Sequence, residues 1–230
     1  MSGGWPLVAR SRFAWLVGVA AVLVFGGLVI NATRPAGPGA EGLPQGTRLP
    51  PFAVVLTSSD VVCDSDDDPC DANVAASGAG DQGEAGRRPA CEVRGPTVLN
   101  ICELTERGPL VLGLMATRED RCVRSFDRLE ALPRRHRGLQ VALVSIRGEL
   151  DDLREVVRAR RWSFPVGWDR DGVLASLYGV ATCPYVVVAR WRGRVEATLL
   201  ATQGSPSDDE LERHIDRAVA ASRRAGWRPA

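Results

Sequence analysis

Hydrophobic positions along the second half of the chain follow two alternating patterns. Continuous apolar runs at 109–116, 140–146 and 185–189 are typical of strands buried on both faces. Between them, apolar residues recur at helical spacing, first at Cys122, Phe126 and Leu129 and then within 149–162. The pattern predicts β-α-β-α-(β-α)-β-β-α, in which the first two strands are parallel and the last two form an antiparallel hairpin.

Turn and capping signals predict where these elements begin and end. Pro133 is expected to end the helix that carries Cys122, and Arg192-Gly193-Arg194 turns the chain into a strand at 195–201. Ser207-Asp-Asp-Glu210 is a capping box that opens the last helix. Upstream, 53–56 is a possible strand. Two further short strands, Cys91–Val93 and Val98–Cys102, are expected to flank the turn at 94–96.

The first thirty residues contain an uncharged stretch, 13–30, that is long enough to span a bilayer as a helix of roughly 27 Å. Arg10 and Arg12 precede it, so the positive-inside rule places the N-terminus in the cytoplasm and the rest of the chain outside. A cleaved signal peptide and a buried core helix are the alternatives. We expect an uncleaved signal anchor, and hence a single-pass protein of the cell membrane.

Five segments follow from these patterns. They are a cytoplasmic N-terminus (1–12), the transmembrane anchor (13–30), a Pro/Gly-rich linker (31–48), an N-terminal β extension with a cysteine-containing acidic insertion (49–106), and an α/β domain (107–226).

Composition removes several function classes. The formal net charge is +1, so no overall basic field points to nucleic acid. All 29 basic residues are arginine, which excludes Schiff-base and P-loop lysine chemistry. The two histidines, His136 and His214, are expected to be solvated. The chain has no C-x₂-C pair or histidine cluster, so we expect no metal and no cofactor.

All six cysteines follow the predicted anchor, and an even number there is consistent with disulfides in an oxidising compartment. Six cysteines permit 15 pairings. Cys63 and Cys70 bound an acidic loop that starts like an EF-hand but fails at Pro69 and Ala75, so we expect a surface loop closed by a structural Cys63–Cys70 disulfide. Cys91 and Cys102 are either a second structural disulfide or two independently buried thiols.

The order of several pieces in the C-terminal half resembles the thioredoxin-like superfamily, in particular membrane-anchored TlpA and redoxin (peroxiredoxin-like) domains. The pieces are Leu110–Thr117 before a cysteine-bearing helix, Phe164-Pro-Val166, Asp169–Gly172, Tyr178-Gly-Val180, and Cys183-Pro184 before an apolar strand. The resemblance implies a mixed central sheet flanked by helices. It also implies that Pro184 is cis and that Pro184 and Thr182 form a platform for substrate.

One departure from these families affects the chemistry. Where they carry C-x-x-C, this chain has Glu119-Asp-Arg-Cys122, so the first thiol is missing. Peroxiredoxin-like members carry T-x-x-C, which matches only in spacing. The resemblance places Cys183, the residue before the proline, against Cys122. Thr117 and Glu119 would lie at the helix N-terminus beside the thiol, where Arg118 and Arg121 favour a thiolate and the acidic neighbours oppose it.

The sequence therefore supports two functions. The first is a thiol–disulfide oxidoreductase or antioxidant redoxin, in which Cys122 is the reactive thiol, Cys183 resolves it, and protein thiols, disulfides or peroxide are substrates. The second is a non-catalytic domain that uses the same disulfide as a staple and serves in binding or scaffolding.

Overall fold

The computed structural model describes residues 15–23, 41–63, 70–75, 88–116, 118–201 and 206–229. The chain divides into two units, Met1–Ala36 and Gly37–Ala230. In the first unit residues 15–23 are helical, and their hydrophobic side chains, such as Trp15, are exposed. Among the described residues no helix combines the length and apolar character needed to cross a bilayer. Half of the anchor predicted at 13–30, residues 13, 14 and 24–30, lies outside those residues.

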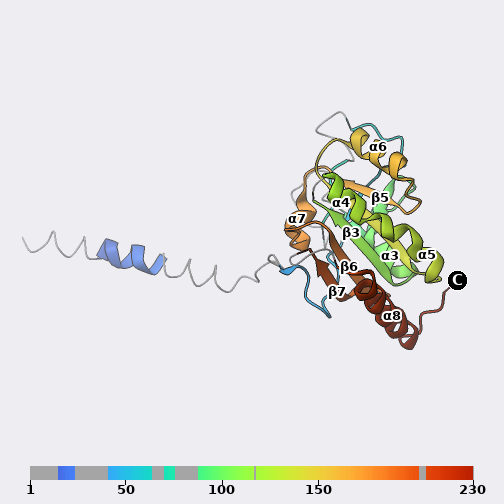
Figure 1. Ribbon diagram of the computed structural model, residues 1–230. Coiled ribbons are helices and arrows are strands. Elements are labelled where there is room, and N and C mark those ends of the chain that lie inside the picture. Colours follow the sequence, from blue (N-terminus) through green and yellow to red (C-terminus); the bar gives the residue numbers. More distant parts are fainter. Residues whose placement is uncertain are drawn as a thin grey trace, which may run out of the picture. The chain divides into compact units, whose positions relative to one another are not determined.

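The second unit is built on a seven-stranded mixed sheet with the order β2-β1-β5-β4-β3-β6-β7 (Figure 1). The strands are β1 (Ala53–Leu56), β2 (Val98–Asn100), β3 (Leu110–Met115), β4 (Gln140–Ile146), β5 (Val166–Asp169), β6 (Tyr185–Arg190) and β7 (Arg194–Leu200). As predicted, β3 and β4 are parallel, and β6 and β7 form an antiparallel hairpin. Every residue of β3 is buried, in agreement with its continuous apolar sequence.

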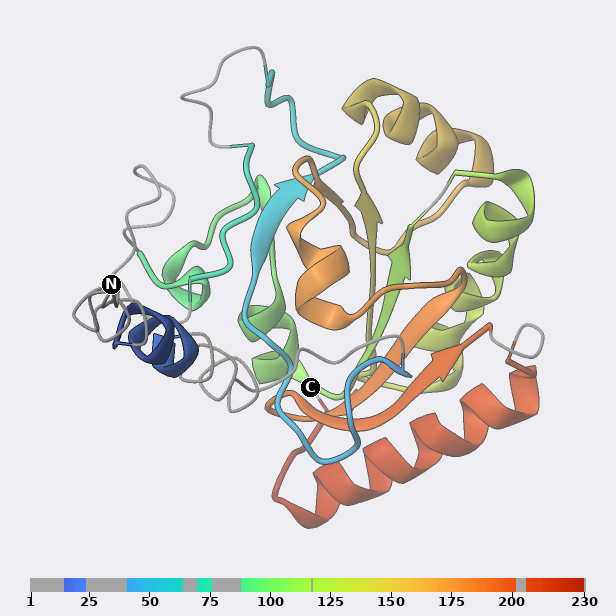
Figure 2. The same ribbon diagram turned by 90° about the vertical axis from the view of Figure 1, so that its left-hand side faces the viewer.

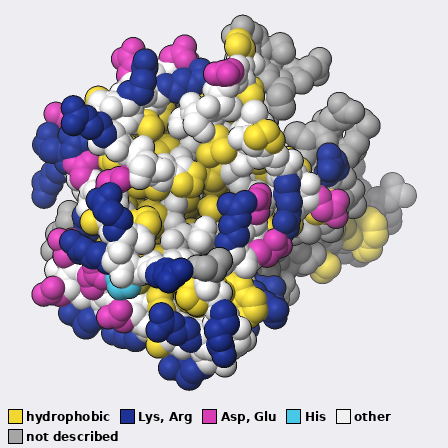
Figure 3. Space-filling view, turned by 90° about the vertical axis from the view of Figure 1, so that its right-hand side faces the viewer, with side chains coloured by type: hydrophobic (Ala, Val, Ile, Leu, Met, Phe, Trp, Pro, Cys, Tyr) yellow, Lys and Arg dark blue, Asp and Glu magenta, His cyan; other side chains and the backbone are white. Residues whose placement is uncertain are grey.

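Helices cover both faces of the sheet (Figure 2). They are α3 (Ile101–Arg107), α4 (Asp120–Ser125), α5 (Leu132–Arg135), α6 (Leu150–Arg160), α7 (Val173–Tyr178) and α8 (Asp208–Arg224), with 3-10 turns η2 (Ala90–Glu92) and η3 (Asp127–Ala131). Side chains of α4, α5, α6 and α8 enter one apolar core, whereas those of α3 and α7 enter the other. Figure 3 shows arginine and acidic side chains interleaved around a central hydrophobic area on one side of the molecule.

Two local predictions were wrong. The hairpin expected across 91–102 is instead the turn η2, the strand β2 and the helix α3, because Asn100 caps α3 by accepting hydrogen bonds from the backbone N–H groups of Cys102 and Glu103. The helix that carries Cys122 does not continue to Pro133. It ends at Ser125, a 3-10 turn follows, and Pro133 lies in the first turn of α5, where proline is favourable.

The break after Ser125 places Phe126 between the helical layer and the sheet. Phe126 is fully buried, and a Cβ atom at Gly113 would lie 2.9 Å from its ring and 2.8 Å from the side chain of Leu143. Only glycine therefore allows this close approach of the segment after α4 to β3.

The start of the second unit packs against the β6–β7 hairpin. Gly46 donates a backbone hydrogen bond to the carbonyl of Val195 (2.9 Å), and the N–H of Val195 returns one to Thr47 (2.9 Å). Leu43 is buried, and its carbonyl accepts a hydrogen bond from the Thr198 hydroxyl (2.8 Å). Residues 42–49, which we call the N-terminal strap, are thus part of this packed unit.

Candidate functional site

One edge of the sheet collects the candidate residues. Strands β3, β4 and β5 are parallel and end at this edge. Strand β6 is antiparallel to β3, with Leu114 opposite Tyr185, so β6 begins where β3 ends. The segment that leads from β3 into α4 therefore meets the segment that leads from α7 into β6. These two segments carry Cys122 and Cys183.

Cys122 and Cys183 form a disulfide, with a Cα–Cα distance of 5.6 Å across 61 residues of sequence. The Cys183–Pro184 peptide bond is cis, as the resemblance implied. Cys122 is only 5% exposed, and Cys183 is partly exposed. Two segments far apart in sequence thus supply one sulfur each at the sheet edge.

The surroundings of Cys122 are apolar on the core side and charged on the outside. Cys122 belongs to the same core as Val123 and Phe126. Glu119, which the resemblance places where related proteins have the first thiol of C-x-x-C, is exposed and is the N-cap residue of α4, but its side chain makes no capping hydrogen bond. The exposed residues 119–121 therefore carry charge but no sulfur.

Arg118 is held by the loop that follows β4. Its guanidinium donates hydrogen bonds to the carbonyls of Arg147 (2.9 Å) and Glu149 (2.7 Å) and forms an ion pair with Asp152 (3.8 Å). Burial lowers the pKa of Arg118, and the charges of Asp152 and Glu149 act against that shift. The sequence suggested Arg118 as a partner for a thiolate, whereas in the structure this guanidinium fastens the 147–149 loop.

The loop that carries Cys183 is fixed by residues that sequence reasoning did not select. The Tyr185 hydroxyl donates to the carbonyl of Tyr178 (2.5 Å) at the end of α7. At the start of α7, the carboxylate of Asp169 accepts from the N–H groups of Gly172 (3.0 Å) and Leu174 (2.9 Å). Burial raises the pKa of Asp169, and these hydrogen bonds oppose the rise. An aspartate three residues before a glycine is a turn signal that could have revealed this role.

The two proposed platform residues differ in their surroundings. Pro184 is buried, and Thr182 is partly buried with its hydroxyl oxygen shielded from solvent. Among the described residues that hydroxyl has no hydrogen-bond partner. Thr117, expected at the helix N-terminus, lies outside the described residues.

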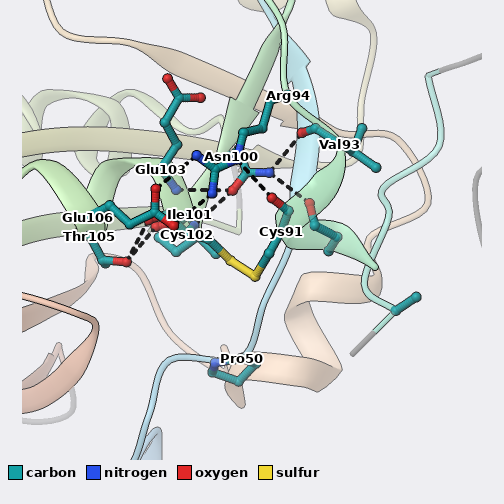
Figure 4. Close-up of a disulfide and its surroundings, with 12 residues drawn as sticks. Pro50, Cys91, Val93, Arg94, Asn100, Ile101, Cys102, Glu103, Thr105 and Glu106 are labelled. Carbon is teal, nitrogen blue, oxygen red and sulfur yellow. Dashed lines mark hydrogen bonds and ion pairs between the residues drawn. A yellow bond between two sulfur atoms is a disulfide. The ribbon is translucent and has the colours of Figure 1, made fainter. Parts of the chain in front are cut away.

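The remaining cysteines form two local disulfides. Cys63 pairs with Cys70 (Cα–Cα 5.8 Å) and Cys91 with Cys102 (5.4 Å). Figure 4 shows the second pair, which joins η2 to α3 beside Asn100. The Asn100 amide donates to the carbonyls of Ala90 (2.7 Å) and Val93 (2.8 Å), so its side chain and the disulfide hold the same two elements together.

The histidines and acidic residues give no sign of a metal site. Among the residues that the structure describes, no three His, Cys, Asp or Glu side chains are placed to hold a metal ion. The prediction that His136 is solvated was wrong, because its side chain is 15% exposed and its Nε2 lies 2.5 Å from the carboxylate of Glu212 on α8.

A groove of about 550 Å³ lies between residues 57–60 and α6. Arg154 of α6 crosses to this segment and donates to the carbonyls of Thr57 (3.2 Å), Ser59 (2.6 Å) and Val61 (3.0 Å). Arg154 therefore fixes the irregular segment that leads from β1 to Cys63.

Comparison with known proteins identifies the fold. No known family profile matches the sequence, and no curated protein is similar to it. A thiol:disulfide interchange protein, described as DsbE, from Chlorobium tepidum aligns over 77% of this chain and 99% of its own, with 19% identity and a TM-score of 0.52.

Two further solved structures agree. A protein from Bacteroides thetaiotaomicron described as a protein disulfide isomerase covers 82% of this chain and 98% of its own (10% identity, TM-score 0.53). A hypothetical protein from Sinorhizobium meliloti covers 78% and 86% (14% identity, TM-score 0.54). The second unit therefore has a thioredoxin-like fold, with β1 and β2 added to the sheet beside β5.

Proposed function

We propose that this protein is a membrane-anchored, extracytoplasmic thiol–disulfide oxidoreductase in which Cys122 and Cys183 are the redox couple. Its substrates are thiols and disulfides of other proteins. The observation that carries the proposal is the disulfide between these two residues, beside a cis proline at the edge of a thioredoxin-like sheet. The names of two similar structures, a thiol:disulfide interchange protein and a disulfide isomerase, are in keeping with it.

The chemistry needs one sulfur that is attacked and one that leaves. A C-x-x-C motif supplies both from one helix, whereas here α4 supplies one and the loop before β6 supplies the other. The non-catalytic staple is the second candidate, and the low exposure of Cys122 (5%) favours it. The two candidates differ in how easily the disulfide is reduced.

A redox titration of the full-length protein separates them. The protein is equilibrated in thiol–disulfide buffers of graded potential, its free thiols are alkylated, and peptides are mapped. We expect the Cys122–Cys183 pair to open at a potential above about −300 mV, the upper range of structural disulfides, and before the other two pairs. A pair that stays closed below that potential would establish the staple and reject the redox role.

Activity supplies the second readout. We expect Cys122→Ser and Cys183→Ser each to abolish reduction of insulin disulfides by the full-length protein with a dithiol as electron donor. The double variant Cys91→Ser/Cys102→Ser is the matched control, because it removes a disulfide that joins η2 to α3, and it should retain activity. If the wild type consumes peroxide faster than it reduces insulin disulfides, the antioxidant reaction is assigned instead.

The membrane anchor is proposed from the apolar stretch 13–30 and the preceding arginines. The full-length protein, expressed in bacteria, should remain in the membrane pellet after alkaline carbonate extraction. In intact spheroplasts, added protease should degrade the folded unit. Release by carbonate, or protection from the protease, would contradict the anchor or its orientation.

A further inference from the structure

The two cysteines of the Cys122–Cys183 disulfide are not equally exposed. Cys122 is 5% exposed and lies among core residues such as Phe126. Cys183 is partly exposed and follows the exposed residue Ala181 in the loop between α7 and β6. Exchange requires a thiolate to reach the sulfur that it attacks, so access decides which of the two reacts.

We infer that Cys183 is the residue on which the mixed disulfide with a substrate forms, and that Cys122 is the buried leaving thiol. This inference rests on the proposed function and reverses the order expected from the sequence, which made Cys122 the reactive thiol. The surface-exposed start of α4, residues 119–121, has no sulfur, so the loop of Cys183 is where an incoming thiol meets the couple.

The reaction is a balanced pair of exchanges. A substrate thiol loses its proton, and the thiolate attacks Sγ of Cys183. A substrate–Cys183 bond forms, the Cys183–Cys122 bond breaks, and Cys122 leaves as a thiolate that takes up a proton. The second substrate thiol, after losing its proton, then attacks the sulfur of the first, forms the substrate disulfide and releases Cys183 as a thiolate. The substrate dithiol is oxidised by two electrons, and the couple is reduced by two.

The inference also assigns different tasks to the surroundings of each sulfur. The core around Cys122 keeps substrates away from the leaving thiol, so the mixed disulfide is resolved by the substrate or by Cys122 itself. The hydrogen bond of 2.5 Å between Tyr185 and Tyr178 joins the two ends of the Cys183 loop, so the backbone on both sides of Cys183 is held in place.

Single-cysteine accessibility tests the order of reaction. Full-length Cys122→Ser retains Cys183, and full-length Cys183→Ser retains Cys122. Each is treated with 5,5′-dithiobis(2-nitrobenzoate) in the folded state and again in denaturant. We expect the thiol of Cys183 to react at least about tenfold faster than that of Cys122 in the folded state, and the two to react equally when unfolded. Equal rates in the folded state, or a faster Cys122, would overturn the inference.

A second measurement uses the wild-type disulfide and needs no variant to fold. The oxidised protein is mixed with glutathione, quenched with acid and mapped. Glutathione on Cys183 with Cys122 free is the expected result, and glutathione on Cys122 would overturn the inference while leaving the proposed couple in place. If neither cysteine acquires glutathione although Cys183 is the faster single thiol, the proposed function fails. The result that Cys183 is more accessible than Cys122 then still holds.

Discussion

The hydroxyl of Tyr185 donates a hydrogen bond to the backbone carbonyl of Tyr178 across 2.5 Å, and this contact closes the loop that carries Cys183. Tyr185→Phe leaves that buried carbonyl without its partner and also removes the acceptor of the Leu43 N–H (3.2 Å). We expect a loss of about 1–3 kcal/mol in the free energy of unfolding and faster thiol exchange at Cys183. Urea unfolding and the rate of exchange with glutathione measure the two effects.

Tyr178→Phe is the matched control for this variant. The Tyr178 hydroxyl donates to the carbonyl of Pro50 (2.7 Å), so this change removes a hydrogen bond of similar kind but leaves the contact across the Cys183 loop. It should lower stability without changing the exchange rate. Equal exchange rates in the two variants would show that the loop contact does not control access to Cys183.

The Cys122–Cys183 and Cys91–Cys102 disulfides should differ in what they contribute to stability. In the chain-entropy model a crosslink stabilises more as the loop that it closes grows. The sequence separation of 61 between Cys122 and Cys183 corresponds to about 4 kcal/mol, and the separation of 11 between Cys91 and Cys102 to about 3 kcal/mol. Denaturant unfolding of the two double-serine variants checks this order. A larger loss from the 91–102 pair would mean that the contacts around η2 outweigh loop entropy.

Arg154→Gln should loosen the segment between β1 and Cys63. The guanidinium donates to three backbone carbonyls of that segment, which glutamine is too short and has too few donors to replace. We expect faster amide hydrogen exchange across 57–63 with little change in α8. Arg158→Gln, an exposed residue whose guanidinium bonds within α6, is the control and should leave the exchange unchanged.

Asp169 should contribute less to stability as the pH rises, which is the opposite of the usual effect of a carboxylate in an ion pair. Burial raises the pKa of this carboxyl above its ordinary value of 3.8, although backbone hydrogen bonds resist the shift. The folded state therefore binds this proton more tightly than the unfolded state, and the contribution of Asp169 to stability falls as the pH rises from 3.8 to the raised pKa.

Asp169→Asn removes the titrating group, so that fall should disappear from urea unfolding measured at a series of pH values. The variant should also lose about 1–3 kcal/mol near neutral pH, because an amide has one oxygen to accept the two N–H groups of Gly172 and Leu174. An unchanged pH dependence would show that Asp169 is not the group responsible.

Patterns of hydrophobic residues predicted the centre of the sheet better than its periphery. The strand at 140–146 agrees at both ends, because six of its seven residues are buried and form a nearly continuous apolar run. Helix α3 was missed because Ile101 and Cys102 continue an apolar run, although Asn100 and Glu103 have the spacing of a helix cap. The break at Phe126 depends on packing against Gly113, a contact between elements that no local pattern contains.

The candidate site shows the same division. Cysteine spacing alone did not show which residue pairs with Cys122, because six cysteines allow 15 pairings, and only the family resemblance placed Cys183 beside it. Tyr185 and Arg118 act through contacts with residues 7 and 29 to 31 positions away, and such contacts follow only from the arrangement of strands at one sheet edge.

The N-terminal strap has a consequence for how copies of this protein behave at high concentration. An outer strand with unpaired backbone groups can recruit the same strand of another molecule and seed aggregation. Here Gly46 and Thr47 occupy backbone groups of Val195 in β7, and the opposite margin of the sheet is β2, a strand of only three residues. The strap at the start of β7 and the short length of β2 thus reduce the strand backbone that is open to pairing with another molecule.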